Sequence, residues 1–248
     1  MYVNTTGLVL RETAYKDSSK ILTVLTSSEG KLTVNARGAL RRNSKFAAVT
    51  QLLVFSEMTL YSSRDRWTLT EARSIEQFAG LRDDLTLLAL GAYFAELTEA
   101  VADEDSPNPE LLPLTLNALY ALSEKIKTPE QVKPAYELRL MAGSGFAPLI
   151  GHCVACGRED MDCVSLDLAG GTIRCDVCGF NEGATLSKSA LNVARYILGC
   201  DAKKLYSFRL GKEALSELAA AAEGYLLAHL DRSFRTLDYL RGIKWINH

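Results

Sequence analysis

The chain has few of the residue patterns that mark enzymes. It contains three histidines, and none of the H-E-x-x-H, G-x-S-x-G, deaminase-type H-x-E with P-C-x-x-C, or G-x-x-x-x-G-K-[ST] motifs occurs in its 248 residues. Each of these motifs supplies the metal ligands, the nucleophile or the phosphate cradle of a large catalytic class. Their absence predicts a protein that is not an enzyme and has no small-molecule substrate.

Long apolar runs are missing as well. The longest strongly apolar segment, 85–95, ends at Glu96, well short of the roughly 20 residues that cross a bilayer. The amino end lacks the basic and apolar stretches of an export signal. We therefore expect a soluble, cytoplasmic protein that has no membrane partner and keeps its six cysteines reduced.

Proline is absent from the first 80 residues, where short runs of alternating apolar residues indicate strands. The expected strands cover 3–11, 20–26, 31–36, 52–61 and 67–74. Five strands in so short a segment favour a small barrel, and the five-stranded OB-fold is a type that binds single-stranded nucleic acid. An SH3-like barrel or an open meander would give nearly the same pattern.

After residue 80 the apolar residues recur every three or four positions, as they do in helices. Helices are expected from Leu81 to a break at 103–109, over 111–125 and 130–142, from a cap at Ser187 to Leu198, and through 215–229. The predicted fold class is α+β. It consists of an amino-terminal OB-fold barrel over 1–80 and a helical domain over 81–150 and 184–248, which carries a four-cysteine zinc module over 151–183.

Four of the six cysteines stand in two C-x-x-C pairs with eighteen residues between the pairs. This spacing lets four thiolates surround one ion tetrahedrally, which is the arrangement of structural zinc sites. The predicted ligands of one structural Zn²⁺ ion are Cys153, Cys156, Cys175 and Cys178. Because four thiolates leave no position for water, the ion would hold the local shape and activate no nucleophile.

Other interpretations of the cysteines are open. Two unrelated pairs of buried thiols, or one redox-active C-x-x-C motif, would give the same sequence pattern. Cys163 lies between the pairs and could replace a ligand. His152 adjoins the first pair but is out of phase with the paired spacing, so it is better explained as a residue of the surface or of the surroundings of the site, and whether it takes part in the metal site is open. Cys200 follows the end of an expected helix and is better explained as a small buried hydrophobic residue.

The net charge of -2 is divided unevenly along the chain. Residues 1–80 carry 11 Lys and Arg against 7 Asp and Glu, whereas residues 81–248 carry 17 against 23. The basic excess is densest over 37–45, where four cations occur without an acid in an expected loop, and such a loop can track a phosphate backbone. An evenly mixed surface, or a basic loop that binds nothing, is the alternative.

The candidate nucleic-acid-binding residues are the cations of the expected barrel, together with aromatic residues that could stack on bases. The cations are Arg11, Lys20, Lys31, Arg37, Arg41, Arg42, Lys45, Arg64 and Arg66. The aromatic candidates are Phe46, Tyr61 and Trp67, of which Trp67 could equally belong to the barrel core. Such contacts address backbone charge and the faces of bases, so they would be largely independent of sequence.

Several short segments are distinctive, and they follow one another in a definite order. They are GLVLR at 7–11, SKILTVLT at 19–26, GKL at 30–32, ARGA at 36–39, AYELRL at 135–140, GFAPL at 145–149, CVACG at 153–157, YLLAHL at 225–230 and RTLDYL at 235–240. In this order and spacing they resemble the RecO family of bacterial recombination mediators. The resemblance spans nearly the whole chain and departs from the family at Thr236, where serine is usual.

The resemblance implies a protein without enzymatic activity that binds single- and double-stranded DNA and anneals complementary strands. It also implies that the protein acts with RecR to load RecA onto DNA covered by single-strand binding protein. The DNA-facing residues that it implies are Lys20, Lys31, Arg37, Arg41, Arg42 and Lys45. From the residues alone, an RNA- or transcription-associated barrel with a zinc ribbon, and a thiol-active enzyme, are alternatives.

Overall fold

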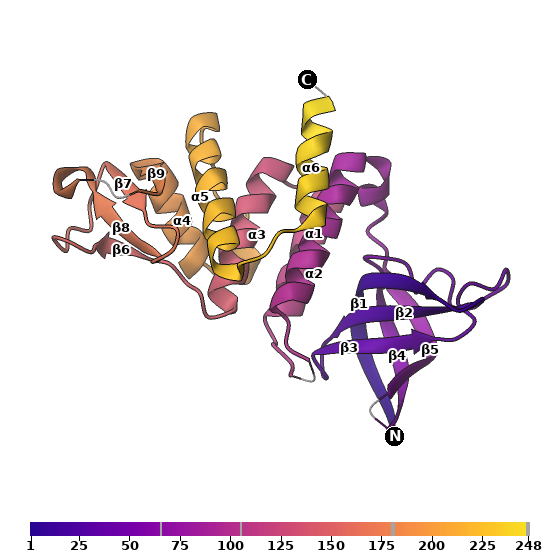
Figure 1. The fold of residues 1–248 in the computed structure, drawn as a ribbon. Helices are drawn as coiled ribbons and strands as arrows, with labels where there is room; N and C mark the ends of the chain where they lie inside the picture. The colour runs from indigo at the N-terminus through magenta and orange to yellow at the C-terminus, as the bar shows by residue number, and fades with distance from the viewer. Residues whose placement is uncertain (65, 105, 180–181, 247–248) are drawn as a thin grey trace. The chain divides into compact units, whose positions relative to one another are not determined.

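The computed structural model describes residues 1–248 except 65, 105, 180–181 and 247–248, and gives only the backbone for 244–246. The chain forms two compact units (Figure 1). Unit 1 contains residues 1–125 and 234–248, and unit 2 contains residues 126–233. The predicted domain limits at 80, 150 and 183 stay predictions.

Unit 1 begins with a closed five-stranded barrel, as predicted. Its strands are β1 (Tyr2–Tyr15), β2 (Ser19–Thr26), β3 (Lys31–Ala36), β4 (Phe55–Ser63) and β5 (Arg66–Glu76). They pair in the order β1-β2-β3-β5-β4, β4 closes the barrel against β1, and only the β3–β5 pair is parallel. The barrel and the helices together confirm the α+β class.

Two strand boundaries differ from the prediction. Strand β1 extends to Tyr15 because it pairs with β2 along the whole length of β2. Strand β4 begins at Phe55 and not at Leu52. Its start is delayed because Leu53 adopts a left-handed backbone conformation with φ of +65° and donates its N–H to the carbonyl of Val9.

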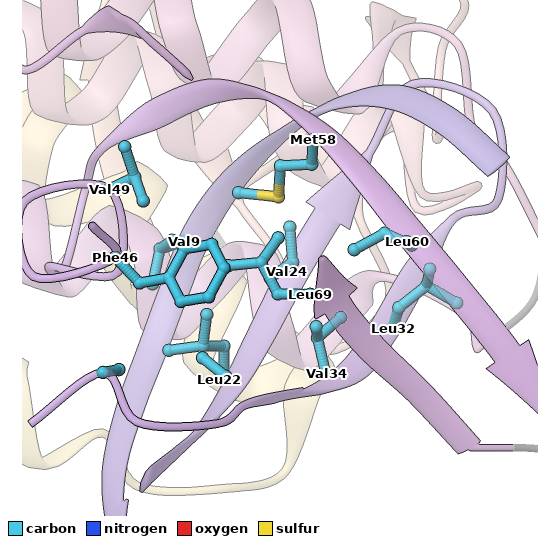
Figure 2. Close-up of a cluster of buried hydrophobic side chains, with 12 residues drawn as sticks. Val9, Leu22, Val24, Leu32, Val34, Phe46, Val49, Met58, Leu60 and Leu69 are labelled. Carbon is cyan, nitrogen blue, oxygen red and sulfur yellow. The ribbon is translucent and has the colours of Figure 1, made fainter. Parts of the chain in front are cut away.

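The barrel core consists of side chains from alternating strand positions (Figure 2). Its members are Val9, Leu22, Val24, Leu32, Val34, Ala36, Ala39, Phe46, Val49, Met58, Leu60 and Leu69. Phe46 comes from the long β3–β4 connection, and its ring points inward among Val9, Val24 and Leu22. With 7% of its surface exposed, Phe46 is a core residue, so its prediction as a stacking residue is wrong. Trp67 is partly buried against this core.

The helices of unit 1 are α1 (Leu85–Val101), α2 (Leu111–Ser123) and α6 (Arg235–Ile246). The first helix begins later than predicted because the Asp84 side chain caps it, accepting the backbone N–H groups of Thr86 and Leu87 at 2.7 and 3.2 Å. Leu81 lies in a preceding 3₁₀ turn.

Helix α6, at the carboxyl end of the chain, packs on α1. The carboxylate of Glu96, in α1, accepts hydrogen bonds from the backbone N–H and the hydroxyl of Thr236 in the first turn of α6. The helix before it, α5 (Lys212–Leu230), is followed by Asp231, whose left-handed φ of +42° ends that helix. The sequence patterns did not separate α6 from the helix before it.

Unit 2 contains α3 (Pro129–Gly143), α4 (Lys188–Gly199), α5 (Lys212–Leu230) and a small sheet. The sheet strands are β6 (Leu149–Cys153), β7 (Cys163–Leu166), β8 (Thr172–Cys175) and β9 (Ala184–Ser187), in the order β6-β8-β7-β9. The sheet was not predicted, because its strands have only four or five residues and no clear alternation.

A buried ion-pair group joins α3 to α5. The Lys133 ammonium lies 2.7 Å from the carboxylate of Glu137 and 2.6 Å from that of Glu223. Burial lowers the pKa of Lys133, but the two carboxylates outweigh that effect and raise the pKa above its ordinary value.

Within the described residues, the helices are too short or too polar to span a bilayer.

Candidate metal centre and nucleic-acid interface

The four predicted cysteine ligands lie together in unit 2. The sulfur atoms of Cys153, Cys156, Cys175 and Cys178 are all within 4.8 Å of one another, and they could hold a metal ion. The Sγ atoms of Cys156 and Cys175 are 3.8 Å apart. Bonds of about 2.3 Å to a tetrahedral zinc ion place neighbouring sulfurs about 3.8 Å apart, so the observed spacing fits such an ion.

Two neighbouring strands and two tight turns position the sulfurs. Cys153 ends β6 and Cys175 ends β8, and these strands run parallel side by side. The second cysteine of each pair is followed by a glycine with positive φ, +74° at Gly157 and +80° at Gly179. Residues with a Cβ rarely adopt this conformation, so glycine lets each chain turn back around the sulfurs.

The electrostatics of the centre favour a bound cation. The backbone N–H of Cys175 donates to Sγ of Cys153 at 3.4 Å, and this hydrogen bond is the main reason that the pKa of Cys153 is lowered to about 6. Hydrogen bonding with the neighbouring cysteine sulfurs raises the pKa of Cys178 to about 12. A bound cation would offset the repulsion between thiolates held this close together.

Three other candidates lie outside this cluster. Cys163 begins β7, where burial and the nearby carboxylates of Glu217 and Asp176 raise the pKa of its thiol. Cys200 directs its Sγ toward the carbonyl of Ile197 at 3.8 Å. His152 is exposed on β6. Within the described residues, the four sulfurs of the two C-x-x-C pairs form the cluster without them.

Arg195 of α4 holds the first cysteine pair in place. Its guanidinium donates to the carbonyls of Ile150 and Gly151 at 2.8 Å each and to the carbonyl of Glu159 at 3.0 Å. Ile150 and Gly151 precede the first cysteine pair and Glu159 follows it, so this one side chain holds the backbone on both sides of the pair.

We expect an Arg195→Ala change to lower the free energy of unfolding of unit 2 by about 2 kcal/mol, because hydrogen bonds to a charged donor contribute about 1.5 to 3 kcal/mol. Chemical denaturation of the purified protein measures this loss. Arg195→Lys is the matched control. It keeps the charge but has a single point donor in place of the planar fork, so it should recover only part of the loss. Full stability in both variants would contradict the anchoring role.

Of the nine candidate cations of the barrel, Lys45 is described with its loop below, and the other eight fall into two sets. Five are exposed and make no ion pair with any residue that the structure describes: Arg37, Arg41, Arg42, Arg64 and Arg66. Three are bound within unit 1. Arg11 pairs with Glu99 at 2.8 Å, Lys31 donates to the carbonyl of Glu99 at 3.1 Å, and the largely buried Lys20 pairs with the carboxylate of Glu12.

Residues 37–45, here called the basic loop, are held by hydrogen bonds to two other parts of the barrel. The N–H of Leu40 donates to the carbonyl of Ser18 at 3.0 Å, and Nζ of Lys45 donates to the carbonyl of Thr70 at 3.1 Å. Lys16, in the same β1–β2 turn as Ser18, is exposed and was not among the predicted site residues. The sequence signal that could have identified Lys16 is its place in the turn between the first two strands.

Arg64 and Arg66 lie at another end of the barrel. Because β3 and β5 run parallel with Val34 beside Trp67, Arg66 lies beside the first half of β3, whereas the basic loop follows the last residue of β3. The candidate cations of the basic loop and of the β4–β5 hairpin therefore form two groups. Tyr61, another of the stacking candidates, is exposed near the second group. It lies across from Tyr2, which the sequence patterns did not identify.

Comparisons with known proteins agree along the whole chain. A family model described as Recombination protein O N terminal matches residues 1–78, and one described as Recombination protein O C terminal matches residues 82–238. A DNA repair protein RecO from Acetivibrio thermocellus is 31% identical over 97% of this chain and 96% of its own length.

Two further relatives carry the same name. The protein from Symbiobacterium thermophilum is 34% identical over 96% of both chains. That from Caldicellulosiruptor bescii is 30% identical over 98% of this chain and 99% of its own. Since the two family models meet near the end of the barrel and the relatives align over nearly their full length, the chain belongs to the RecO family of DNA repair proteins.

Proposed function

We propose that this protein is a DNA-binding recombination mediator without enzymatic activity. It binds single- and double-stranded DNA through unit 1, anneals complementary strands and, with RecR, helps to load RecA onto DNA covered by single-strand binding protein. The observation that carries the proposal is the basic loop, which exposes Arg37, Arg41 and Arg42 without ion pairs to any described residue on an OB-type barrel.

The charge of the basic loop supplies a physical route to annealing. Cations that bind phosphates release condensed counterions and reduce the repulsion between two strands held close together. Since these contacts address the backbone and not the base edges, they leave the bases free to pair. The net acidic residues 81–248 are less suited to DNA, so they are the more natural place for RecR and single-strand binding protein.

We propose that the ion of the cysteine cluster is Zn²⁺ and that it braces unit 2. Four thiolates at tetrahedral spacing suit zinc and fill its coordination shell, so the bound ion would supply structure and no catalysis. A thiol-active enzyme would need a free reactive cysteine. Metal analysis and thiol labelling of the purified protein test that alternative. One zinc ion per chain, with no reactive thiol at the four positions, would contradict it.

An annealing assay tests the proposed function. The purified protein is mixed with two complementary labelled oligonucleotides, and duplex formation is followed over time. The parent protein should accelerate annealing, and a variant with Arg41→Ala and Arg42→Ala should do so much less. If the parent protein has no effect on the annealing rate, the proposal of strand annealing is wrong. Competition with a matched RNA strand tests the preference for DNA.

The pairing of Arg11 with Glu99 leads to a second test of the DNA-facing surface. Arg11 has 63% of its side chain exposed, although Glu99 lies 2.8 Å away. We expect a Glu99→Gln change to increase the affinity for DNA about two- to fivefold, because an exposed ion pair of this kind contributes up to about 1 kcal/mol and its loss frees Arg11 for a phosphate. Fluorescence anisotropy at low salt measures the change.

The control for this test is Glu110→Gln, which removes one negative charge from an exposed position at the start of α2. This variant accounts for the general effect of net charge and should change the affinity less than Glu99→Gln does. Equal effects of the two substitutions would show that Arg11 makes no special contact with DNA.

A further inference from the structure

We propose that the barrel carries a second nucleic-acid site, separate from the basic loop, where unpaired bases of a single strand stack on Tyr2 and Tyr61. The two tyrosines face each other across β1 and β4, with ring centroids 5.0 Å apart and an interplanar angle of 48°. They are 68% and 39% exposed. This site deepens the proposed function and rests on it.

The aromatic pair is exposed and lies outside the barrel core. The barrel core is complete without it, and the rings lie on the outer surface of the sheet. The Met1 nitrogen donates to the carbonyl of Ser62 at 2.9 Å, so the first residues of β1 are held against the end of β4. The tyrosines are therefore fixed side by side, and a base that stacks on them would lose little of its affinity to ordering the protein.

A groove lies farther along the same outer surface, and the residue pair next to the aromatic pair on that face lines it. It has a volume of about 640 Å³, and its lining includes Asn4, Thr6, Glu57, Thr59, Glu71 and Arg73. Asn4 pairs with Thr59 two residues along from the pairing of Tyr2 with Tyr61, and successive alternate residues share a face of a sheet. Amide, hydroxyl and carboxylate groups can bond the edges of bases, and a carboxylate accepts from base amino groups.

The charges around the pair match a nucleic-acid strand whose phosphates lie at the hairpin and whose bases lie toward the groove. Arg66 pairs with Ser63, two residues along β4 from Tyr61, and Arg64 lies in the same hairpin turn. In the groove the carboxylates of Glu57 and Glu71 outnumber the one cation, Arg73, and would disfavour phosphates there, whereas the two arginines of the hairpin attract them. This separation of charge orients a strand and favours a nucleic acid over an uncharged ligand.

The site is distinct from the basic loop. Lys45 of the loop reaches the carbonyl of Thr70, four residues along β5 from Arg66, and four residues of a strand span about 13 Å. The amino terminus, marked N in Figure 1, lies at the end of the barrel where Tyr2 and Tyr61 meet. Two contacts on one barrel allow a strand to be held by its phosphates at one place and by its bases at the other.

The discriminating property of this site is its preference for unpaired bases, because the bases of a duplex are already stacked. We expect Tyr2→Ile with Tyr61→Ile to weaken the binding of a labelled single strand of about 15 nucleotides at least about tenfold. One lost stack changes affinity about 5- to 150-fold. Binding of the matched duplex should change less than about twofold. The salt dependence should be unaltered, since stacking releases no counterions.

Tyr2→Phe with Tyr61→Phe is the matched control and should bind both DNAs like the parent, because the rings remain. For these measurements any purification tag is placed at the carboxyl end of the full-length protein, so that the chain around Tyr2 is unchanged. If the isoleucine variant binds the single strand as the parent does, while Arg41→Ala with Arg42→Ala weakens binding, the stacking site is wrong and the proposed function stands. If the parent binds neither DNA, both fail.

A second variant covers the case in which the isoleucine variant does not fold, as judged by its thermal melt. Arg64→Gln with Arg66→Gln changes only the hairpin turn and its flank. It should lower the slope of the logarithm of single-strand affinity against the logarithm of salt concentration by about 0.7 for each lost phosphate contact. An unchanged slope overturns the proposal. Equal weakening of single-strand and duplex binding by the isoleucine variant also overturns it.

Discussion

A Cys153→Ser change is expected to lower the free energy of unfolding of unit 2 by on the order of 4 kcal/mol or more, which is the range for loss of a structural metal. Cys153 is fully buried, and its sulfur accepts the N–H of Cys175. Because zinc binding by such sites is coupled to folding, removal of one thiolate weakens the site and the fold together. Thermal denaturation with and without a strong chelator measures the effect.

Two controls separate this effect from the general cost of replacing a cysteine. Cys163→Ser and Cys200→Ser alter half-buried thiols that lie outside the cluster, and both variants should keep the metal content and chelator sensitivity of the parent. DNA binding by Cys153→Ser should persist below its melting temperature, since the basic loop belongs to unit 1. If a strong chelator leaves the melting temperature of the parent protein unchanged, the proposed metal site is wrong.

A variant with both Arg41→Ala and Arg42→Ala is expected to bind single-stranded DNA one to two orders of magnitude less tightly at low salt. Both side chains are exposed, and neither makes an ion pair with a residue in the described part of the chain. If each contacts one phosphate, the slope of the logarithm of affinity against the logarithm of salt concentration falls by about 1.4 for single strands and about 1.8 for duplex. A titration series from low to moderate salt measures both quantities.

The matched control removes two exposed cations from unit 2. Lys203→Ala with Lys204→Ala changes the net charge equally and should leave the salt slope within experimental error of the parent. Should the two double variants lose affinity equally, DNA binding would depend on net charge alone and the basic loop would have no special role. A loss of affinity with an unchanged slope would mean that the arginines act without contacting phosphates.

The residues of the metal centre could be predicted because their spacing alone restricts the chemistry. Each C-x-x-C pair is local, and few structures other than a metal site explain two pairs followed by glycine at Gly157 and Gly179. The anchoring role of Arg195 could not be predicted in this way. Its three carbonyl acceptors are 36 to 45 residues away in sequence, and backbone carbonyls leave no trace in side-chain patterns.

The cationic surface could be predicted only in part, because a count of charges does not show which ones are already paired. Arg11, Lys20 and Lys31 look as available in the sequence as Arg41 does. The fold brings Glu99 beside the first and third and Glu12 beside the second. Phe46 is a second example. In the sequence, an aromatic ring within a basic segment suggests stacking on bases, whereas in the fold this ring is buried in the barrel core.

The sequence by itself determined the periodicities, the cysteine spacing and the uneven charge, and with them the barrel, most helices and the four cysteines that come together in unit 2. These features are local, and a short stretch of chain contains all the information they need. Only the tertiary structure decided which cations stay unpaired, that Tyr2 meets Tyr61, and that α6 returns to α1. Each of these depends on strand register or on contacts between residues far apart in sequence, and side-chain patterns along the chain do not specify such contacts.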